Sequence, residues 1–409
     1  MRVLFTLLPA TGSLHPLLPV ARALVQAGHH VAFCSSRAFG PQIEAHGFRA
    51  FAAGLDFLIS DPRYIEVLCQ AAGLTFPPLT GKARFAWVTN QLFIGAAGQR
   101  MLPDLVALAR DWGADLIVRE SLEFSGCVAA ERLGLPHAAV AAAADSALDL
   151  RAQLAEPLTE LRVQAGLPPD PDVQMPYRFL HLCFMPPGWD GPDAIFPETA
   201  HFLQHTNPPR PGASVPPWLE RLSARPLLLV SLGTVFHRTP GLVERILEGL
   251  RDEPITLLVA VGQDQDPARF GPQPTSVRIE RYLPLPQLLP RCALLVTHGG
   301  FNSTKEALSC GVPLVVIPIA GDQPYCAERC VALGVAQVVG PDQRTPERIR
   351  DAVRAVLDDP SYRARAEAMR QEMQALPGIQ HAVELLVSLA SERRALLGHA
   401  STGLRGTAV

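Results

Sequence analysis

The sequence predicts an α/β protein made of two doubly wound domains, each with a parallel sheet covered by helices. Short apolar runs alternate along the chain with segments whose apolar residues recur at helical spacing. The length of 409 residues fits two domains of ordinary size. Five prolines between Gln204 and Pro217 predict an interdomain linker, so we expect one domain over residues 1–205 and a second over 218–375.

The composition excludes several classes of function. Apolar residues make up 48% of the chain and charged residues 18%, which predicts a globular protein. A net charge of -3 without a run of Lys or Arg argues against nucleic acid as a partner. The chain has no run of eighteen apolar residues, so no membrane span is expected. Eight scattered cysteines form no C-x-x-C pair, and we expect reduced, buried thiols in a cytoplasmic protein.

The first domain opens with a predicted strand, turn and helix. Residues 2–8 form a short apolar run, which favours a first parallel strand over a signal peptide. Helical spacing follows from Leu17 to Ala27, and Pro16 suits the first helical position. The pattern G-x-G-x-x-G of dinucleotide-binding domains does not occur in this turn, so a nicotinamide cofactor is not expected.

His15 is the candidate catalytic base. It follows the first strand, at the edge of a parallel sheet where ligands bind. A helix N-terminus favours the neutral imidazole, which is the form that a general base needs. The alternative is a loop histidine that only caps the helix.

The stretch from Thr297 to Gln323 carries the most specific pattern in the chain. Residues 293–296 predict a buried strand, and Gly299 and Gly300 let the backbone turn sharply after it. Asn302 or Ser303 can cap the helix that follows, with Glu306 in its first turn. A helix N-terminus after a glycine turn favours phosphate, because free N–H groups and the positive end of the helix dipole point there.

The order of these residues resembles the sugar-nucleotide signature of family 1 glycosyltransferases, the UDP- or dTDP-sugar-dependent enzymes that glycosylate plant metabolites, macrolides and other antibiotics. The matching elements are His-Gly-Gly at 298–300, Asn302-Ser303, Glu306, Gly-Val-Pro at 311–313 and Asp322-Gln323. The resemblance implies the GT-B fold, in which two Rossmann-like domains face each other across a cleft. Residues 376–409 would then supply a helix that crosses back to the first domain, followed by a tail. An ordinary strand–turn–helix unit, whose glycines serve only the turn, is the alternative.

The resemblance also implies roles in donor binding. The pyrophosphate would be held by His298, Gly300, Asn302 and Ser303, with Gly299 in the same turn. Glu306 would bind the ribose, and Asp322 and Gln323 the sugar hydroxyls. A second glycine turn follows the predicted strand 227–231, where Ser231, Gly233 or Thr234 would face the donor phosphate or cap a helix. Tyr282, with Leu283 beside it, takes roughly the place of the aromatic residue that stacks on the base.

By the same resemblance, the N-terminal half binds a small and largely apolar acceptor, such as a natural product, polyketide or phenol, whose hydroxyl His15 deprotonates. An acidic residue after the predicted strand 115–121 would orient the imidazole and stabilise its protonated form. Glu120 takes this place, and Glu123 is the alternative. The aromatic residues Phe57, Phe85 and Trp87 could line the acceptor pocket or pack in an ordinary core.

Together these residues predict an inverting glycosyltransferase that uses a UDP- or dTDP-sugar as co-substrate and needs no further cofactor. Asp170-Pro171-Asp172 and Asp264-Gln265-Asp266 imitate the metal-binding Asp-x-Asp of another glycosyltransferase fold. Both lie in proline-containing loop sequence and are interpreted as solvated acids, so no metal is expected. A sugar-nucleotide epimerase and a non-catalytic nucleotide-sugar-binding subunit are the alternative functions. The sequence leaves open the acceptor, the sugar, the base of the donor, and whether the protein is a monomer or a homodimer.

Overall fold

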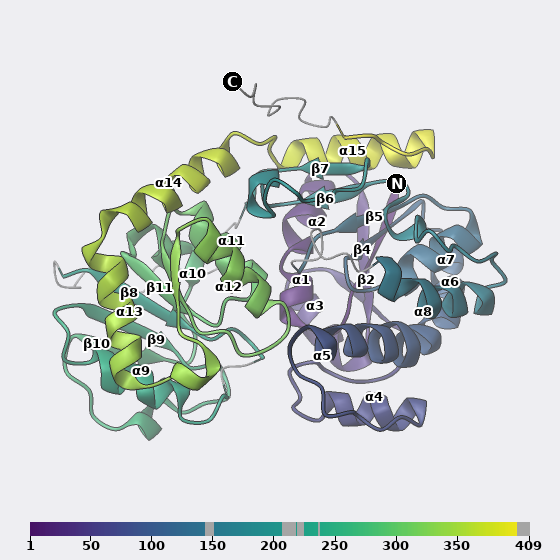
Figure 1. The fold of residues 1–409 in the computed structure, drawn as a ribbon. Helices are drawn as coiled ribbons and strands as arrows, with labels where there is room; N and C mark the ends of the chain where they lie inside the picture. Colours follow the sequence, from purple (N-terminus) through teal and green to yellow (C-terminus); the bar gives the residue numbers. More distant parts are fainter. Residues whose placement is uncertain (144–150, 207–217, 219–224, 236–237, 399–409) are drawn as a thin grey trace. The chain divides into compact units, whose positions relative to one another are not determined.

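The computed structural model describes residues 1–143, 151–206, 218, 225–235 and 238–398 (Figure 1). The chain divides into two compact units, of which the first comprises Met1–Gln204 and Pro377–Val409 and the second comprises His205–Leu376. Each unit holds one parallel sheet with helices packed against it. The predicted class of two parallel-sheet α/β domains is therefore confirmed.

The first unit is built on a seven-stranded sheet in the order β3-β2-β1-β4-β5-β6-β7. Its strands are β1 Arg2–Thr6, β2 His30–Ser35, β3 Arg49–Ala52, β4 Leu116–Glu120, β5 His137–Val140, β6 His181–Cys183 and β7 Ala200–Phe202. Alternate residues of β1 enter different buried clusters, because Val3 and Phe5 pack on one face of the sheet and Leu4 packs on the other. Burial on both faces explains why these strands are continuous apolar runs in the sequence.

Helices cover both faces of this sheet. They are α1 Thr11–Leu14, α2 Leu17–Gln26, α3 Gly40–Glu44, α4 Tyr64–Ala72, α5 Gly81–Trp87, α6 Gln99–Trp112, α7 Ser125–Leu133, α8 Arg151–Gln164 and α15 Ile379–Glu392. The last of them, α15, lies beside α2, and Leu386 and Leu389 share a buried cluster with Leu17 and Leu24 (Figure 1). The C-terminal helix is thus an integral part of the first core.

A π-helical segment, η2 Val88–Gly98, joins α5 to α6 in one continuous helical stretch. This stretch, Gly81–Trp112, is the one described helix that is long and apolar enough to cross a membrane by length and composition. More than half of its most apolar window, 56%, is buried inside the protein, as in the core helix of a globular domain. The expectation that the chain lacks a membrane span stays a prediction.

The second unit is built on a six-stranded parallel sheet in the order β10-β9-β8-β11-β12-β13. Its strands are β8 Leu227–Ser231, β9 Thr256–Ala260, β10 Val277–Glu280, β11 Leu294–Thr297, β12 Leu314–Val316 and β13 Ala336–Val338. Its helices are α9 Leu242–Leu250, α10 Leu285–Leu288, α11 Phe301–Ser309, α12 Gln323–Ala332, α13 Pro346–Asp358 and α14 Pro360–Gln374. Both sheets reverse their strand order at an inner pair, β1/β4 in the first unit and β8/β11 in the second. Such a switch point is where ligands bind in open parallel sheets.

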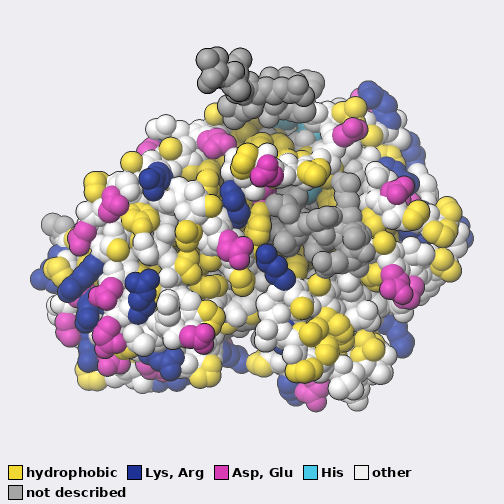
Figure 2. Space-filling model, viewed as in Figure 1, with side chains coloured by type: hydrophobic (Ala, Val, Ile, Leu, Met, Phe, Trp, Pro, Cys, Tyr) yellow, Lys and Arg dark blue, Asp and Glu magenta, His cyan; other side chains and the backbone are white. Residues whose placement is uncertain are grey.

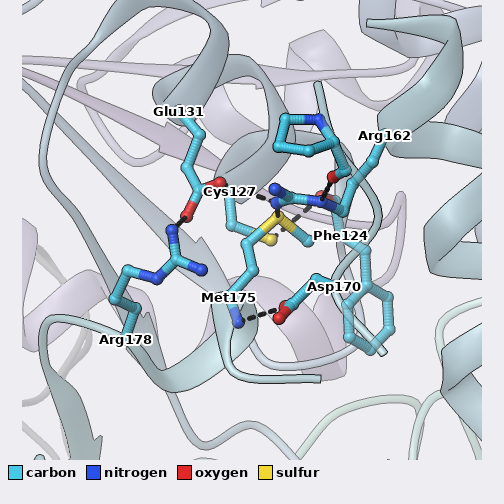
Figure 3. A network of polar contacts seen from close by, with 8 residues as sticks. Phe124, Cys127, Glu131, Arg162, Asp170, Met175 and Arg178 are labelled. Atoms are coloured by element: carbon cyan, nitrogen blue, oxygen red, sulfur yellow. Dashed lines mark hydrogen bonds and ion pairs between the residues drawn. The ribbon is translucent and has the colours of Figure 1, made fainter. Parts of the chain in front are cut away.

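Buried charges tie α7 and α8 to the segment that precedes β6 (Figure 3). The carboxylate of Glu131 on α7 accepts a hydrogen bond of 2.6 Å from Nη1 of the buried Arg162 on α8, and a further one from Arg178. Nearby, Asp170 is buried and accepts a hydrogen bond of 2.6 Å from the backbone N–H of Met175. The interpretation of Asp170 as a solvated acid is therefore wrong, because its carboxylate fixes the loop before η3 Met175–Tyr177.

Two histidines of the first sheet are buried and neutral. Neither ring nitrogen of His137 has a hydrogen-bond partner among the described residues, and Nδ1 of His181 has none either. Burial, followed by the nearby charge of Arg119, lowers the pKa of His137 well below 6.5 and that of His181 to about 3. Both rings therefore stay uncharged in the folded protein under conditions where a solvated histidine takes up a proton.

We expect the first unit to lose stability as the pH falls below about 6.5, because unfolded histidines then bind protons that the folded ones exclude. The loss continues until His181 protonates in the folded state, near pH 3. Above pH 6.5 both rings are neutral in both states and contribute nothing. His181→Phe removes the contribution of one of these histidines, which is a loss of about 1.4 kcal/mol in the free energy of unfolding per pH unit for one proton. Its urea midpoint should therefore fall less steeply with decreasing pH than that of the wild type.

The control for this measurement is His30→Phe, because His30 is exposed at the start of β2. Its pH profile should follow that of the wild type. Equal slopes for His181→Phe and the wild type would contradict the assignment of acid sensitivity to the buried ring.

Candidate active site

The switch point of the first sheet places His15 and Glu120 at the same edge. β1 and β4 are neighbours in register, with Thr6 opposite Arg119, so the segments that follow them leave the sheet side by side. The turn predicted at residues 11–16 contains the four-residue helix α1, and His15 lies at its C-terminal end, immediately before Pro16, which precedes α2. The ring of His15 is half-buried and meets the ring of His46 edge-on, with 6.3 Å between centroids.

Glu120 is fully buried at the end of β4. Its carboxylate accepts hydrogen bonds from the backbone N–H groups of Leu8, at 3.4 Å, and Leu122, at 2.8 Å. Burial, assisted by the charge of Glu123, raises the pKa of Glu120 to about 7 against the opposing effect of these two hydrogen bonds. The carboxyl group thus joins the segments that follow β1 and β4, and it changes charge near neutral pH.

Glu123 has a structural task of its own. Its Oε1 accepts hydrogen bonds from the backbone N–H of Ser125 at 2.6 Å and of Gly126 at 3.2 Å, at the start of α7. Its Oε2 accepts a hydrogen bond from the hydroxyl of Thr6 on β1. A carboxylate engaged in this way caps the helix and links it to the sheet. Of the two acids, Glu120 is the better placed to act on chemistry at this edge.

Two of the three predicted acceptor residues lie in one apolar cluster. Phe57 and Trp87 pack with Leu8 and Leu122, which directly follow the site strands β1 and β4. Trp87 also meets the ring of Phe76 edge-on, with 5.2 Å between centroids. Phe85 instead packs against a different buried cluster, on the other side of α5. Apolar side chains also gather on the surface over α4 and α5 (Figure 2).

The switch point of the second sheet holds the remaining candidates. β8 and β11 are neighbours, with Ser231 opposite Thr297, and each strand ends in a glycine turn. The ring of His298 fills the space between the turns. A Cβ atom at Gly233 would lie 2.6 Å from the ring, and one at Gly300 would lie 2.7 Å from it. Glycine at both positions is therefore required by the close approach of the imidazole.

The His298 ring is held in a defined state. It is buried, its Nδ1 lies 3.3 Å from the hydroxyl of Thr297, and it is hydrogen-bonded to the backbone of Ser231. Burial lowers its pKa to about 4, although the hydrogen bond to Ser231 acts in the opposite direction. At neutral pH the ring therefore carries a single N–H proton, which donates to the backbone carbonyl of Ser231 and fixes the ring between the two turns.

The helix after this turn begins earlier than the sequence predicts. The N-cap of α11 is Gly300, which has extended backbone angles, so Asn302 and Ser303 lie in the first turn and do not cap the helix. Glu306 lies beyond the first turn, which contains no acidic residue. The predictions of a capping Asn302 or Ser303 and of Glu306 in the first turn are therefore wrong. The first N–H groups of α11 nevertheless point out of the sheet edge beside His298, as anion binding requires.

The other donor candidates surround the same sheet edge. Asp322 is the N-cap of α12, and Gln323 is buried as its first residue. Thr234 is exposed in the turn after β8. Tyr282, which is 41% exposed, and the buried Leu283 follow β10, two strands away from β8. The ring of Tyr282 therefore reaches the surface at this edge, whereas Leu283 contributes to the core.

Of the predicted Asp-x-Asp sequences, the second also has structural roles. Asp264 forms an ion pair with Arg238, and Asp266 accepts a hydrogen bond of 3.2 Å from the backbone N–H of Ala268 at the start of η6 Pro267–Phe270. Among the described residues, no group of three or more His, Cys, Asp or Glu side chains is arranged to hold a metal.

Comparison with known proteins connects these features. The N-terminal domain of the family described as erythromycin biosynthesis protein CIII-like matches residues 22–233, and its C-terminal domain matches residues 249–389. 4'-Demethylrebeccamycin synthase of Lentzea aerocolonigenes is 31% identical, over 95% of this chain and 99% of its own. L-Demethylnoviosyl transferase of Streptomyces niveus is 30% identical, over 97% of this chain and 99% of its own.

The solved structures agree with the sequence comparisons. The crystal structure of the glycosyltransferase VinC in complex with dTDP is 28% identical and has a TM-score of 0.76. The match covers 96% of this chain and 100% of VinC. The likeness therefore extends through both α/β units.

We expect Gly233→Ala to weaken nucleotide binding, because the added methyl group would displace the ring of His298. The displaced ring would shift the turns that it holds apart, and misplacing one backbone N–H that donates to a charged group predicts a decrease in affinity of about tenfold or more. The measurement is titration calorimetry with dTDP and with UDP.

Gly241→Ala is the matched control for this substitution. Gly241 also has a positive φ, +69°, but a Cβ atom there would make only ordinary contacts, the nearest at 3.6 Å. The control suffers the backbone strain of about 1 kcal/mol without the collision. Equal affinities of the two variants for both nucleotides would show that the His298 ring does not contact the diphosphate.

Proposed function

The chain belongs to the erythromycin biosynthesis protein CIII-like family of nucleotide-sugar glycosyltransferases, and we propose that it moves a sugar from a dTDP- or UDP-sugar to a hydroxyl of a small, largely apolar natural product. The observation that carries this proposal is the neutral His298 ring between two glycine turns at the β8/β11 switch point. Beside it, the first N–H groups of α11 offer a site for a diphosphate. The named relatives are transferases, which leaves the epimerase alternative without support.

The second unit would bind the donor. In this proposal His298, Gly299, Gly300, Asn302 and Ser303 surround the diphosphate, with Ser231, Gly233 and Thr234 on the neighbouring turn. Glu306 binds the ribose, Tyr282 stacks on the base with Leu283 behind it, and Asp322 and Gln323 meet the sugar. VinC was solved with dTDP, which favours thymidine over uridine as the nucleoside.

The first unit would bind the acceptor and supply the base. The apolar cluster that contains Phe57 and Trp87 adjoins the segments after β1 and β4, and an apolar wall suits an aglycone. Phe85 packs on the other side of α5 and is not part of that wall. His15 takes the acceptor proton as the oxygen attacks the anomeric carbon, so the sugar–phosphate bond breaks with inversion and the nucleoside diphosphate leaves.

Glu120 would support His15 through charge. An ionised carboxylate at the same sheet edge stabilises the imidazolium that forms when the base accepts its proton. Since the carboxylate is bonded to the backbone of Leu8 and Leu122, its effect on the ring would be electrostatic and would require its ionised form. We further propose that no metal takes part, because the dipole and the first N–H groups of α11 can stabilise the departing diphosphate.

Eight free thiols, seven of them buried, support the cytoplasm as the compartment in which the protein works.

The proposed reaction predicts release of dTDP from a dTDP-sugar only when an acceptor is present, and it predicts that this turnover survives excess EDTA. The helix terminus and neutral donors take the place of a cation, so chelation should change the rate less than about twofold. Chromatography of donor, product and free nucleotide measures both. A donor sugar that changes without acceptor would indicate an epimerase, and activity restored only by magnesium or manganese would refute the metal-free mechanism.

His15→Ala should lower turnover on an alkyl alcohol by about a hundred- to ten-thousand-fold, the usual contribution of a general base. Donor affinity should stay nearly constant, because the donor residues belong to the second unit. Turnover of a nitrophenol acceptor should fall least, because its hydroxyl is already acidic. His30→Ala, at an exposed site on β2, serves as the control. Full activity of His15→Ala on the alkyl alcohol would leave the base unidentified.

Glu120→Gln should give a smaller loss that depends on pH. The carboxyl group has a pKa of about 7, so it is mostly protonated below that pH and mostly ionised above it. The advantage of the wild type over Glu120→Gln should therefore grow as the pH rises from about 6 to about 8. A ratio of rates that is constant over this range would assign Glu120 a structural role only.

A further inference from the structure

The loop formed by residues 318–322 connects β12 to α12 at the edge of the second sheet where the strands end. It leads into Asp322 and Gln323, the residues that the proposed function assigns to the hydroxyls of the donor sugar. The position of these two side chains depends on how the backbone of the loop is held. Two side chains hold it, and they come from different parts of the chain.

The first is Gln323 itself. Its Oε1 accepts hydrogen bonds from the backbone N–H of Ile319 at 2.7 Å and of Ala320 at 2.9 Å. The side chain is buried, with 2% of its surface exposed. The amide oxygen is therefore occupied by the loop, and only the amide NH₂ group of Gln323 remains to donate to a sugar hydroxyl.

The second is Arg344, which follows η8 Pro341–Gln343 in the next crossover, between β13 and α13. Its Nη2 donates a hydrogen bond of 2.7 Å to the carbonyl oxygen of Pro318, the first residue of the loop. Its Nε is buried and has no hydrogen-bond partner among the described residues. The half-buried guanidinium thus donates a hydrogen bond to the backbone of this loop.

The surroundings of Arg344 do not favour a purely stabilising role. Burial and the nearby charge of Arg245 on α9 both lower its pKa, with Asp342 acting in the opposite direction. A guanidinium keeps its charge under all ordinary conditions, so the protein holds two cations close together at the ligand-binding edge of the sheet. Such an arrangement costs stability, so it does not explain the presence of Arg344 by a gain in folding free energy.

We propose that Arg344 is a positioning residue for the donor sugar, which holds the carbonyl of Pro318 and thereby sets Asp322 and Gln323 in place for the sugar hydroxyls. This inference rests on the proposed function, since it takes residues 322 and 323 as the sugar contacts. The inference assigns the two parts of the donor to different groups of residues. The nucleoside diphosphate is held by the His298 turn and α11, and the sugar is held through the loop that Arg344 secures.

Substitution of Arg344 should therefore weaken binding of the sugar more than binding of the nucleoside diphosphate. Arg344→Met should weaken binding of dTDP-glucose by roughly three- to tenfold, the effect of losing one hydrogen bond from a charged group at a partly exposed site. Binding of dTDP should change less than about twofold, because the diphosphate contacts do not involve the loop. Arg344→Lys should recover part of the loss, since an ammonium group can donate one hydrogen bond to the same carbonyl.

Arg363 offers a matched control at the opposite edge of the same sheet. Its Nη1 donates to the carbonyl of Gly311 at 2.6 Å and its Nη2 to that of Cys292 at 3.0 Å, just before β12 and β11 begin. Arg363→Met therefore also removes a guanidinium bound to backbone carbonyls. It should lower the melting temperature but leave the ratio of the dTDP and dTDP-glucose affinities unchanged.

The experiment is calorimetric titration of the full chain and its three variants with dTDP and dTDP-glucose, together with a melting curve for each. A lower ratio of dTDP-glucose to dTDP affinity in Arg344→Met alone, partly restored in Arg344→Lys, is the expected result. Equal weakening of both ligands in Arg344→Met, or the same change of ratio in Arg363→Met, would overturn the inference. Failure of the wild type to bind dTDP, UDP and the glucose conjugate of each would instead refute the proposed function.

Discussion

The imidazole of His298 occupies the space that side chains at positions 233 and 300 would need. The arrangement of the two glycine turns in the second unit depends on this contact. The ring joins the turns after β8 and β11, the two strands at the switch point of the sheet. Gly299 adopts a φ of +82° so that the backbone can turn behind the ring. Burial keeps the ring neutral, so in the proposed reaction the charge of the departing diphosphate would be met by N–H dipoles that are fixed before the reaction begins.

The local structure around His298 was largely predictable because backbone geometry defines it. An apolar run, a glycine turn and a helix impose the positions of their own N–H groups, whatever the rest of the chain does. The prediction of where α11 begins is wrong. Asn302 and Ser303 are good capping residues, yet Phe301 is buried and the helix begins there. A cap contributes about 1 kcal/mol, whereas burying a Phe side chain contributes about 1.5–3 kcal/mol, so packing decides the boundary.

The acids after β4 show a different limit. Sequence spacing brings Glu120 and Glu123 to one sheet edge but cannot distinguish them, because the difference is made by residues distant in the chain. Thr6 on β1 donates to Glu123, which also caps α7. Burial raises the pKa of Glu120 to about 7, although the two backbone N–H groups that donate to its carboxylate act in the opposite direction. The interpretation of Asp170 as a solvated acid is wrong for another reason, because its carboxylate accepts a hydrogen bond from the backbone N–H of Met175 in the same loop.

The acceptor half is the least predictable because side-chain packing, not backbone geometry, forms it. Phe85 and Trp87 are two residues apart on α5, and helical neighbours at that spacing point to different sides. Trp87 accordingly joins the cluster above the site strands, while Phe85 joins the cluster on the other side. The π-helical segment that follows shifts the register of the next turns, so helical periodicity no longer indicates which residues face the cluster. The packing of these aromatic side chains therefore has to be read from the three-dimensional structure, whereas the strand, glycine turn and helix around His298 can be read from the order of residues.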